Sequence, residues 1–139
     1  MGNEIFGLSE EMRDEKAEVK KIVRKPYVPW VVGGTEYRLK LTAKAIVKLE
    51  NKYGQNLLSV ISPEEGLPPV GVLLTVIQAS MEKFEHNASF GVVTDIYDSY
   101  VDNGGDMTKL MEEVIMELLE NAGFFTEEIS KEMKKDTEL

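Results

Sequence analysis

The sequence contains no cysteine and only one histidine, His86, among its 139 residues. Without cysteine there is no disulfide, no thiolate zinc site and no cysteine nucleophile. A serine nucleophile needs a base, and His86 lies in the polar segment Glu85-His-Asn-Ala-Ser89 without a Gly-x-Ser-x-Gly context. We therefore interpret His86 as a surface residue and Ser89 as a helix cap, and we predict no catalytic residue.

Long apolar runs are also missing. No segment approaches the roughly 18 consecutive apolar residues that are needed to cross a bilayer. Near the N-terminus, Glu4, Glu10 and Glu11 occupy positions where a signal peptide needs an apolar core. The sequence therefore predicts a cytoplasmic protein with no membrane partner.

Positive charge is scarce in the second half of the chain. The net charge is −9, and its distribution is uneven: residues 1–26 carry six acids and six bases, residues 27–63 have a surplus of +3, and residues 64–139 have a deficit of −12. Such an acidic surface repels phosphate backbones, so we predict no nucleic-acid partner. The basic middle is suited to an acidic partner, and another copy of the chain would be one, which makes a homo-oligomer a possible assembly.

Two β-prone runs joined by Gly33-Gly34 predict a hairpin over residues 27–41, because both turn positions accept a positive φ. In the second run the residues alternate strictly between an apolar and a charged face. The apolar face holds Tyr37, Leu39 and Leu41, and the charged face holds Glu36, Arg38 and Lys40. A lone hairpin is marginal in water, so we expect it to pack on helices or on a neighbouring molecule.

Apolar residues at helical spacing predict helices for most of the remaining chain. The predicted helices cover residues 42–53 with Thr42 as cap, 69–84, 89–102, 106–122 with Asp106 as cap, and 126–133, and a short apolar piece lies at 57–61. Their predicted apolar faces include Val47 and Val101. The helix over 69–84 is apolar almost all round, so we expect it at the centre of the fold.

These elements predict a mainly α fold: a compact domain of about five helices with a small N-terminal β-hairpin (α+β). Residues 1–26 form a charged N-terminal arm or helix, residues 27–125 form the single domain, and residues 126–139 form a C-terminal helix and tail. We find no internal repeat and no long linker.

The segment from Asp95 to Asp106 is rich in carboxylates and therefore suggests a metal site at first sight. A helical projection places Asp95, Asp98 and Asp102 on one solvent-facing side of a helix, and Asp106 at the start of the next. A calcium loop starting at Asp95 would need a glycine at its sixth position, where Tyr100 stands. We therefore predict no metal and no cofactor.

Two other functional classes remain open as alternatives. A divalent-metal-dependent hydrolase would need Asp95, Asp98 and Asp102 to converge with ligands from elsewhere in the fold. A small helical regulator would need a basic recognition helix, which the charge pattern does not favour.

An interaction surface is the remaining candidate. Seven methionines are many for this length, and Met116 projects from the acidic side of its predicted helix. Flexible methionine side chains suit a surface that contacts a variable partner. We predict a partner-binding surface made of the charged face of the hairpin and the acidic helices, with residues Glu36, Arg38, Lys40, Asp98 and Met116.

The order and spacing of several segments resemble those of a known family. The segment Tyr37-Arg-Leu-Lys-Leu-Thr-Ala-Lys-Ala-Ile-Val-Lys-Leu-Glu-Asn-Lys-Tyr-Gly-Gln-Asn-Leu57 resembles the opening block of tail assembly chaperones from long-tailed phages and prophages of Gram-positive hosts. The segments 73–84, 95–106 and 110–125, the last ending in Ala-Gly-Phe-Phe, resemble the second block. The resemblance covers residues 27–125 and includes no catalytic motif.

This resemblance implies a non-enzymatic helper of tail assembly in the host cytoplasm, absent from the mature virion. Such chaperones bind the long tape-measure protein before the tail tube forms around it, so the tape-measure protein and the tail tube protein are the implied partners. Members often make a longer form of themselves by ribosomal frameshifting near the end of the short reading frame. Lys134-Lys135, five residues from the C-terminus, is where adenine-rich codons would allow such a slip.

Overall fold

The computed structural model of the chain describes residues 23–63, 66–125 and 132. Most of the predicted N-terminal arm, most of the predicted helix at 126–133, and Lys134-Lys135 therefore lie outside the described residues.

The first two elements form the predicted β-hairpin. Strands β1 (Val28–Val32) and β2 (Thr35–Leu39) pair antiparallel, with Val28 opposite Leu39 and Val32 opposite Thr35. Gly33 and Gly34 take φ values of 56° and 83°, which side chains other than glycine rarely adopt. The predicted hairpin is confirmed.

Seven helical elements follow in the described part of the chain. They are α2 (Ala43–Tyr53), α3 (Leu57–Ile61), α4 (Val70–Met81), α5 (Phe90–Asp102), α6 (Met107–Leu110), the π-helical turn η1 (Met111–Ile115) and α7 (Met116–Asn121). The last three continue one another without a break, so the described residues form five helical segments. The predicted mainly helical fold with an N-terminal hairpin is confirmed.

The predicted helix caps are also present. The side-chain oxygens of Thr42, Ser89 and Asp106 accept hydrogen bonds from the backbone N–H three residues later, at 3.1, 3.2 and 2.8 Å. Each satisfies a backbone donor that the first turn of its helix leaves free. Residues 42, 89 and 106 therefore set where α2, α5 and α6 begin.

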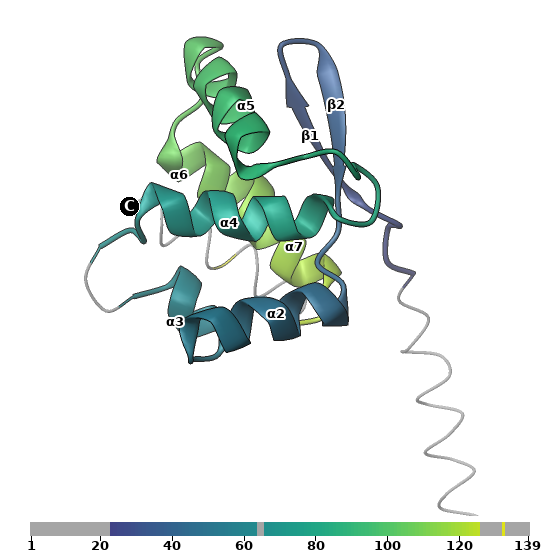
Figure 1. The fold of residues 1–139 in the computed structure, drawn as a ribbon, viewed down its shortest axis with the longest axis vertical. Coiled ribbons are helices and arrows are strands. Elements are labelled where there is room, and N and C mark those ends of the chain that lie inside the picture. The colour runs from purple at the N-terminus through teal and green to yellow at the C-terminus, as the bar shows by residue number, and fades with distance from the viewer. Residues whose placement is uncertain (1–22, 64–65, 126–131, 133–139) are drawn as a thin grey trace, which may run out of the picture.

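Helix α4 occupies the centre of the domain, as its all-round apolar sequence predicted. Leu73, Val76 and Ile77 are fully buried. In Figure 1, α2 and α3 lie on one side of α4, α5 lies on the other side, and α6 and α7 lie behind it. The hairpin stands beside α5, and its inward-facing Val28, Trp30 and Val32 join the same hydrophobic core.

Two valines of the predicted apolar faces are exposed. Val47 on α2 is 54% exposed and Val101 on α5 is 44% exposed. Both stand at the margin of the apolar arc in a helical projection. Leu49 of α2 and Val93 of α5 face the core. The buried side of each helix is narrower than its apolar arc, so the two valines remain in solvent.

The predicted helix over residues 106–122 is interrupted by the π-helical turn η1. A π turn holds one more residue than an α turn and rotates the following residues relative to the preceding face. Leu118 and its neighbour Leu119 are both buried after this turn. Met116, predicted to project from the acidic side, is partly buried and packs against the core. That prediction was wrong.

No helix among the described residues is long and apolar enough to span a membrane.

Candidate functional site

A pocket of about 380 Å³ opens between the hairpin and the segment that links α4 to α5. Tyr37 of β2 and Met81 of α4 form part of its wall, and α5 contributes Val92 and Ile96. Residues 84–88 of the linking segment complete the lining. The pocket is thus built from Tyr37 of the hairpin and from one continuous stretch, residues 81–96, that is distant from it in sequence.

The end of α4 and the linking segment are held against β2 and the residue that follows it by hydrogen bonds. The backbone N–H of Arg38 donates to Oε1 of Glu85 at 3.1 Å, and that of Lys40 donates to the carbonyl of Ser80 at 2.7 Å. The Arg38 side chain returns to the same carboxylate, with its Nε 3.6 Å from Oε1 of Glu85. These contacts occupy an N–H group of β2 and one just after it that would otherwise be free to pair with another chain.

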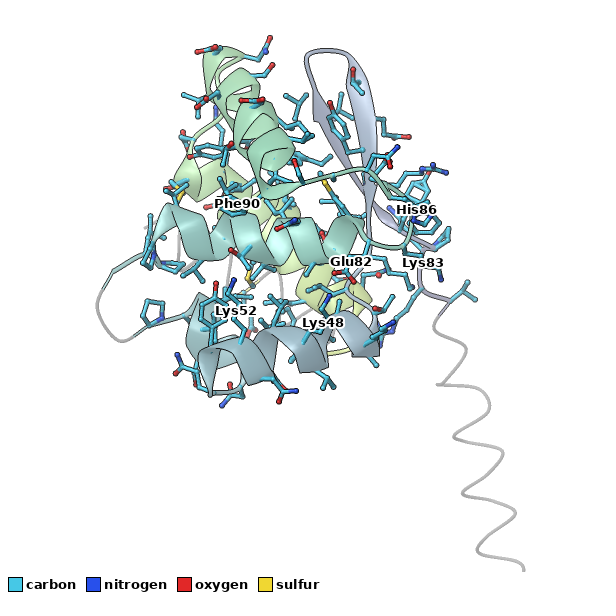
Figure 2. The ribbon with its side chains drawn as sticks, in the orientation of Figure 1. Lys48, Lys52, Glu82, Lys83, His86 and Phe90 are labelled. Atoms are coloured by element: carbon cyan, nitrogen blue, oxygen red, sulfur yellow. The ribbon has the colours of Figure 1, made fainter. Side chains whose placement is uncertain are left out.

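The ring of Phe84 is the centre of an aromatic and cationic cluster at the rim of the pocket. Tyr27 meets it edge-on, with ring centroids 5.7 Å apart. The guanidinium of Arg38 and the ammonium of Lys83 lie 5.2 and 5.6 Å from its centroid, within the range of cation–π attraction. Figure 2 shows Lys83 and His86 together on this linking segment.

The lining of the pocket combines apolar and polar side chains. Its apolar part includes Met81, Val92 and Ile96, and its polar part includes Glu85, His86 and Asn87. His86 is exposed, as predicted, and Ser89 is engaged as the cap of α5, at 3.2 Å from the Val92 N–H. A pocket of this size and lining fits one or two apolar side chains of a partner.

The predicted partner-binding residues are spread over the surface. Glu36 and Arg38 are exposed on β2, and Lys40 is half-buried just after it. Asp98 is exposed on α5, and Met116 is half-buried on α7. Arg38 alone among them reaches the pocket, through Glu85 and Phe84, and the partner-binding set as a whole stays a prediction.

The aspartates of α5 do not form a cluster. Asp95, Asp98 and Asp102 are exposed along one side of α5, and Asp106 caps α6. In residues 23–63, 66–125 and 132, no three histidine or acidic side chains are grouped so that they could hold a metal ion.

A second polar feature lies inside the domain, where the sequence offered no signal for it. The Trp30 and Tyr100 rings meet edge-on, with centroids 5.6 Å apart. Trp30 Nε1 and the Tyr100 hydroxyl are buried, and neither has a hydrogen-bond partner among the described residues. Burial, and then the nearby carboxylates Glu113 and Asp106, raise the pKa of Tyr100 to about 12. Only the packing of β1 on α5 brings these two polar atoms into the interior.

Comparison with known proteins places this fold in a family. A model of a family of unknown function, DUF6096, matches residues 23–139. The chain belongs to this family. No curated protein and no solved structure matches the chain. Because the family carries no assigned activity, any function has to be argued from the residues and the pocket of this chain.

Proposed function

We propose that this member of the family is a non-enzymatic tail assembly chaperone of a phage or prophage, which binds the tape-measure protein in the host cytoplasm. The observation that carries the proposal is the order of segments over residues 27–125. Their order and spacing resemble those of tail assembly chaperones block by block. The longer frameshifted form and the tail tube protein are further partners that the resemblance implies.

The pocket supplies a physical means of holding such a client. A tape-measure protein is long and largely helical, and its apolar stripe needs cover until the tail tube forms. The pocket presents Tyr37, Val92 and Ile96, and the cationic groups of Arg38 and Lys83 lie beside Phe84 of its lining. An apolar side chain of a client helix would lose contact with water there, while the rim contacts polar residues beside it.

The small size of the pocket suits a chaperone that must release its client. An interface centred on about 380 Å³ of open pocket holds one or two side chains rather than a whole helix. The deficit of −12 over residues 64–139 adds repulsion between complexes and so opposes aggregation. Weak binding at each site, repeated along a long client, gives retention without permanent capture.

Co-expression with the tape-measure protein of the same phage or prophage tests the proposal. We expect the soluble fraction of the tape-measure protein to rise when this chain is present. An equally insoluble tape-measure protein with and without the chain would contradict the proposal.

A pair of matched variants tests the pocket itself. Val92→Lys places a charge at the pocket wall at a position that is 43% exposed, so the fold tolerates it. Val31→Lys makes the same change at a position of β1 that is 60% exposed and outside the pocket. We expect Val92→Lys to abolish the solubilising effect and Val31→Lys to retain it. Retention in both variants would assign client binding to another surface, and loss in both would attribute the effect to the added charge rather than to the pocket.

A further inference from the structure

Helix α2 carries an exposed valine beside two lysines. Val47 lies three residues after Lys44 and one residue before Lys48, and all three side chains are exposed. Residues three and four apart are neighbours on a helix surface, so the lysines line one flank of the valine. We name Lys44, Val47 and Lys48 the basic face. Ala45 and Leu49 of the same helix are buried, so the basic face points away from the core.

Helix α5 carries the same arrangement with the opposite charge. Val101 lies three residues after Asp98 and one residue before Asp102, and all three are exposed. We name Asp98, Val101 and Asp102 the acidic face. Because the spacing is identical to that of the basic face, the two surfaces have the same local shape and opposite sign.

The two faces cannot meet within one molecule. Helix α4 lies between α2 and α5, so the faces belong to different sides of the domain (Figure 1). Within the chain, Lys48 pairs with Glu82 at 2.9 Å, and the two side chains are 63% and 46% exposed (Figure 2). An ion pair this exposed contributes little, so Lys48 can exchange it for another carboxylate at small cost.

We propose that a second copy of this chain docks its acidic face on the basic face of the first. Charge complementarity identifies a second copy as the partner. Residues 27–63 carry +3 and residues 64–139 carry −12, so the acidic half of one copy is attracted to the basic part of the next. The contact is heterologous, since each copy contributes a different face. Its repetition gives open chains or rings of copies rather than a closed two-fold dimer.

The spacing also sets the orientation of the contact. If α2 and α5 of two copies cross nearly antiparallel with valine against valine, both charged flanks fall on the same side. Lys44 then lies opposite Asp102. Lys48 lies opposite Asp98. Each pair is offset by about 3 Å along the helix axis, which flexible lysine side chains bridge easily.

The resulting association is weak and sensitive to salt. Two short helix faces bury less surface than a standard stable interface, and the net charge of −9 on each copy opposes the approach of another. Four exposed charges give most of the specificity, and salt screens them. The basic and acidic faces therefore associate at high protein concentration and moderate salt.

Analytical ultracentrifugation of the full chain, without any client, tests the proposal. At about 0.1 M salt we expect the average mass to rise above 15.7 kDa as concentration increases, and at about 0.5 M salt to return towards it. A mass that stays at 15.7 kDa up to a concentration on the order of 1 mM would overturn the proposal. Because no client is present, this result is independent of the tail-chaperone function.

Charge reversal identifies the faces. Lys44→Glu with Lys48→Glu, and Asp98→Lys with Asp102→Lys, should each hold the chain at the monomer mass, because both faces then have the same sign. An equimolar mixture of the two double variants should associate again, since each variant now complements the other. A mixture that stays monomeric, or a double variant that associates like the native chain, would overturn the proposal.

Two further variants separate the faces from general effects. Glu36→Lys with Glu113→Lys changes the net charge as much as the aspartate reversal does, at exposed sites off both faces, and should keep the association. Loss of association there would assign the effect to net charge and overturn the proposal. Val47→Ser keeps every charge and should weaken association several-fold, and circular dichroism melting verifies that each variant is folded.

Discussion

Gly105 lies directly against the ring of Tyr100. A Cβ atom on Gly105 would stand 2.5 Å from Cδ2 and Cζ of that ring, closer than real Cβ contacts allow. The Gly105 N–H donates to the Tyr100 carbonyl at 2.8 Å, which folds the chain back over the end of α5. The adjacent Gly104 has a φ of 96° and open space around it. The two glycines are therefore required for different reasons: one for its backbone angle, the other for a close approach.

Replacing Gly105 with alanine should destabilise the fold. The added methyl group must displace a buried ring, and overpacking of this kind costs about 1–3 kcal/mol. Urea unfolding measures the change. Gly71→Ala is the matched control, because Gly71 is helical and a Cβ there meets nothing within 4 Å. Its free energy of unfolding should stay unchanged or rise by roughly 0.5–1 kcal/mol. Equal losses at both positions would contradict the close packing.

The Tyr100 hydroxyl should make stability depend on pH in alkaline solution. Its pKa is raised to about 12 in the folded chain, above the ordinary value of 10.0, so the folded state binds the proton more tightly than the unfolded state. The proton on this hydroxyl therefore favours the folded state. That part of the free energy of unfolding is fully present below pH 10 and is lost as the pH rises through 12. Each unit of this shift corresponds to roughly 1.4 kcal/mol. Phenolate absorbance during an alkaline titration detects this late ionisation, and Tyr97, whose pKa is also raised by burial and by the nearby Asp106 and Asp98, ionises late as well.

Tyr100→Phe should remove the Tyr100 component of the late ionisation without destabilising the fold at neutral pH. The hydroxyl is buried without a partner among the described residues, so its removal relieves an unpaired polar group. Thermal melting at neutral pH should show an equal or higher midpoint. A clear fall in the midpoint would indicate that an ordered water molecule satisfies the hydroxyl.

Glu85 should stabilise the domain mainly by accepting a backbone hydrogen bond. Glu85→Gln keeps an oxygen for the Arg38 N–H and removes only an exposed ion pair, so we expect a loss of less than about 1 kcal/mol. Glu85→Ala leaves the N–H without its acceptor, and we expect a larger loss of about 1–2 kcal/mol. Chemical unfolding of both variants compares them. Equal losses would assign the effect to the charge.

Divalent cations should leave the thermal stability of the protein unchanged. Asp95, Asp98 and Asp102 lie exposed along one helix and supply no closed set of ligands. Melting with and without millimolar Mg²⁺ or Mn²⁺ tests the alternative of a metal-dependent hydrolase. A rise in the melting temperature that Asp98→Asn removes would favour that alternative.

Local sequence patterns predicted the helices and the hairpin well, because caps and turns depend on residues that are close together in the sequence. Thr42, Ser89 and Asp106 were recognised as caps from their type and position, and each accepts the expected hydrogen bond. Gly33 and Gly34 predicted the hairpin turn from the backbone angles that only glycine adopts readily. The central place of α4 followed from its apolar sequence on every side.

Which side of each helix is buried was predicted less well, because burial depends on the elements that pack against the helix. Val47 and Val101 have core-type side chains, yet the neighbouring helices contact other sides of α2 and α5 and leave both in solvent. Met116 was predicted to face a partner, and the rotation introduced by η1 turns it partly onto the core. A helical projection assumes a regular helix, and the π turn breaks that assumption.

The sequence by itself determined the positions of the hairpin and helices, the solvent exposure of the α5 aspartates and the absence of cysteine chemistry. These follow from residue type and short-range spacing, which act through the nearest turns of the backbone. The tertiary structure alone decided that Phe84, Arg38 and Glu85 meet at the rim of a pocket, and that Trp30 packs on Tyr100. Those contacts join residues tens of positions apart, and they form only because α4 brings the hairpin, the linking segment and α5 together around one core.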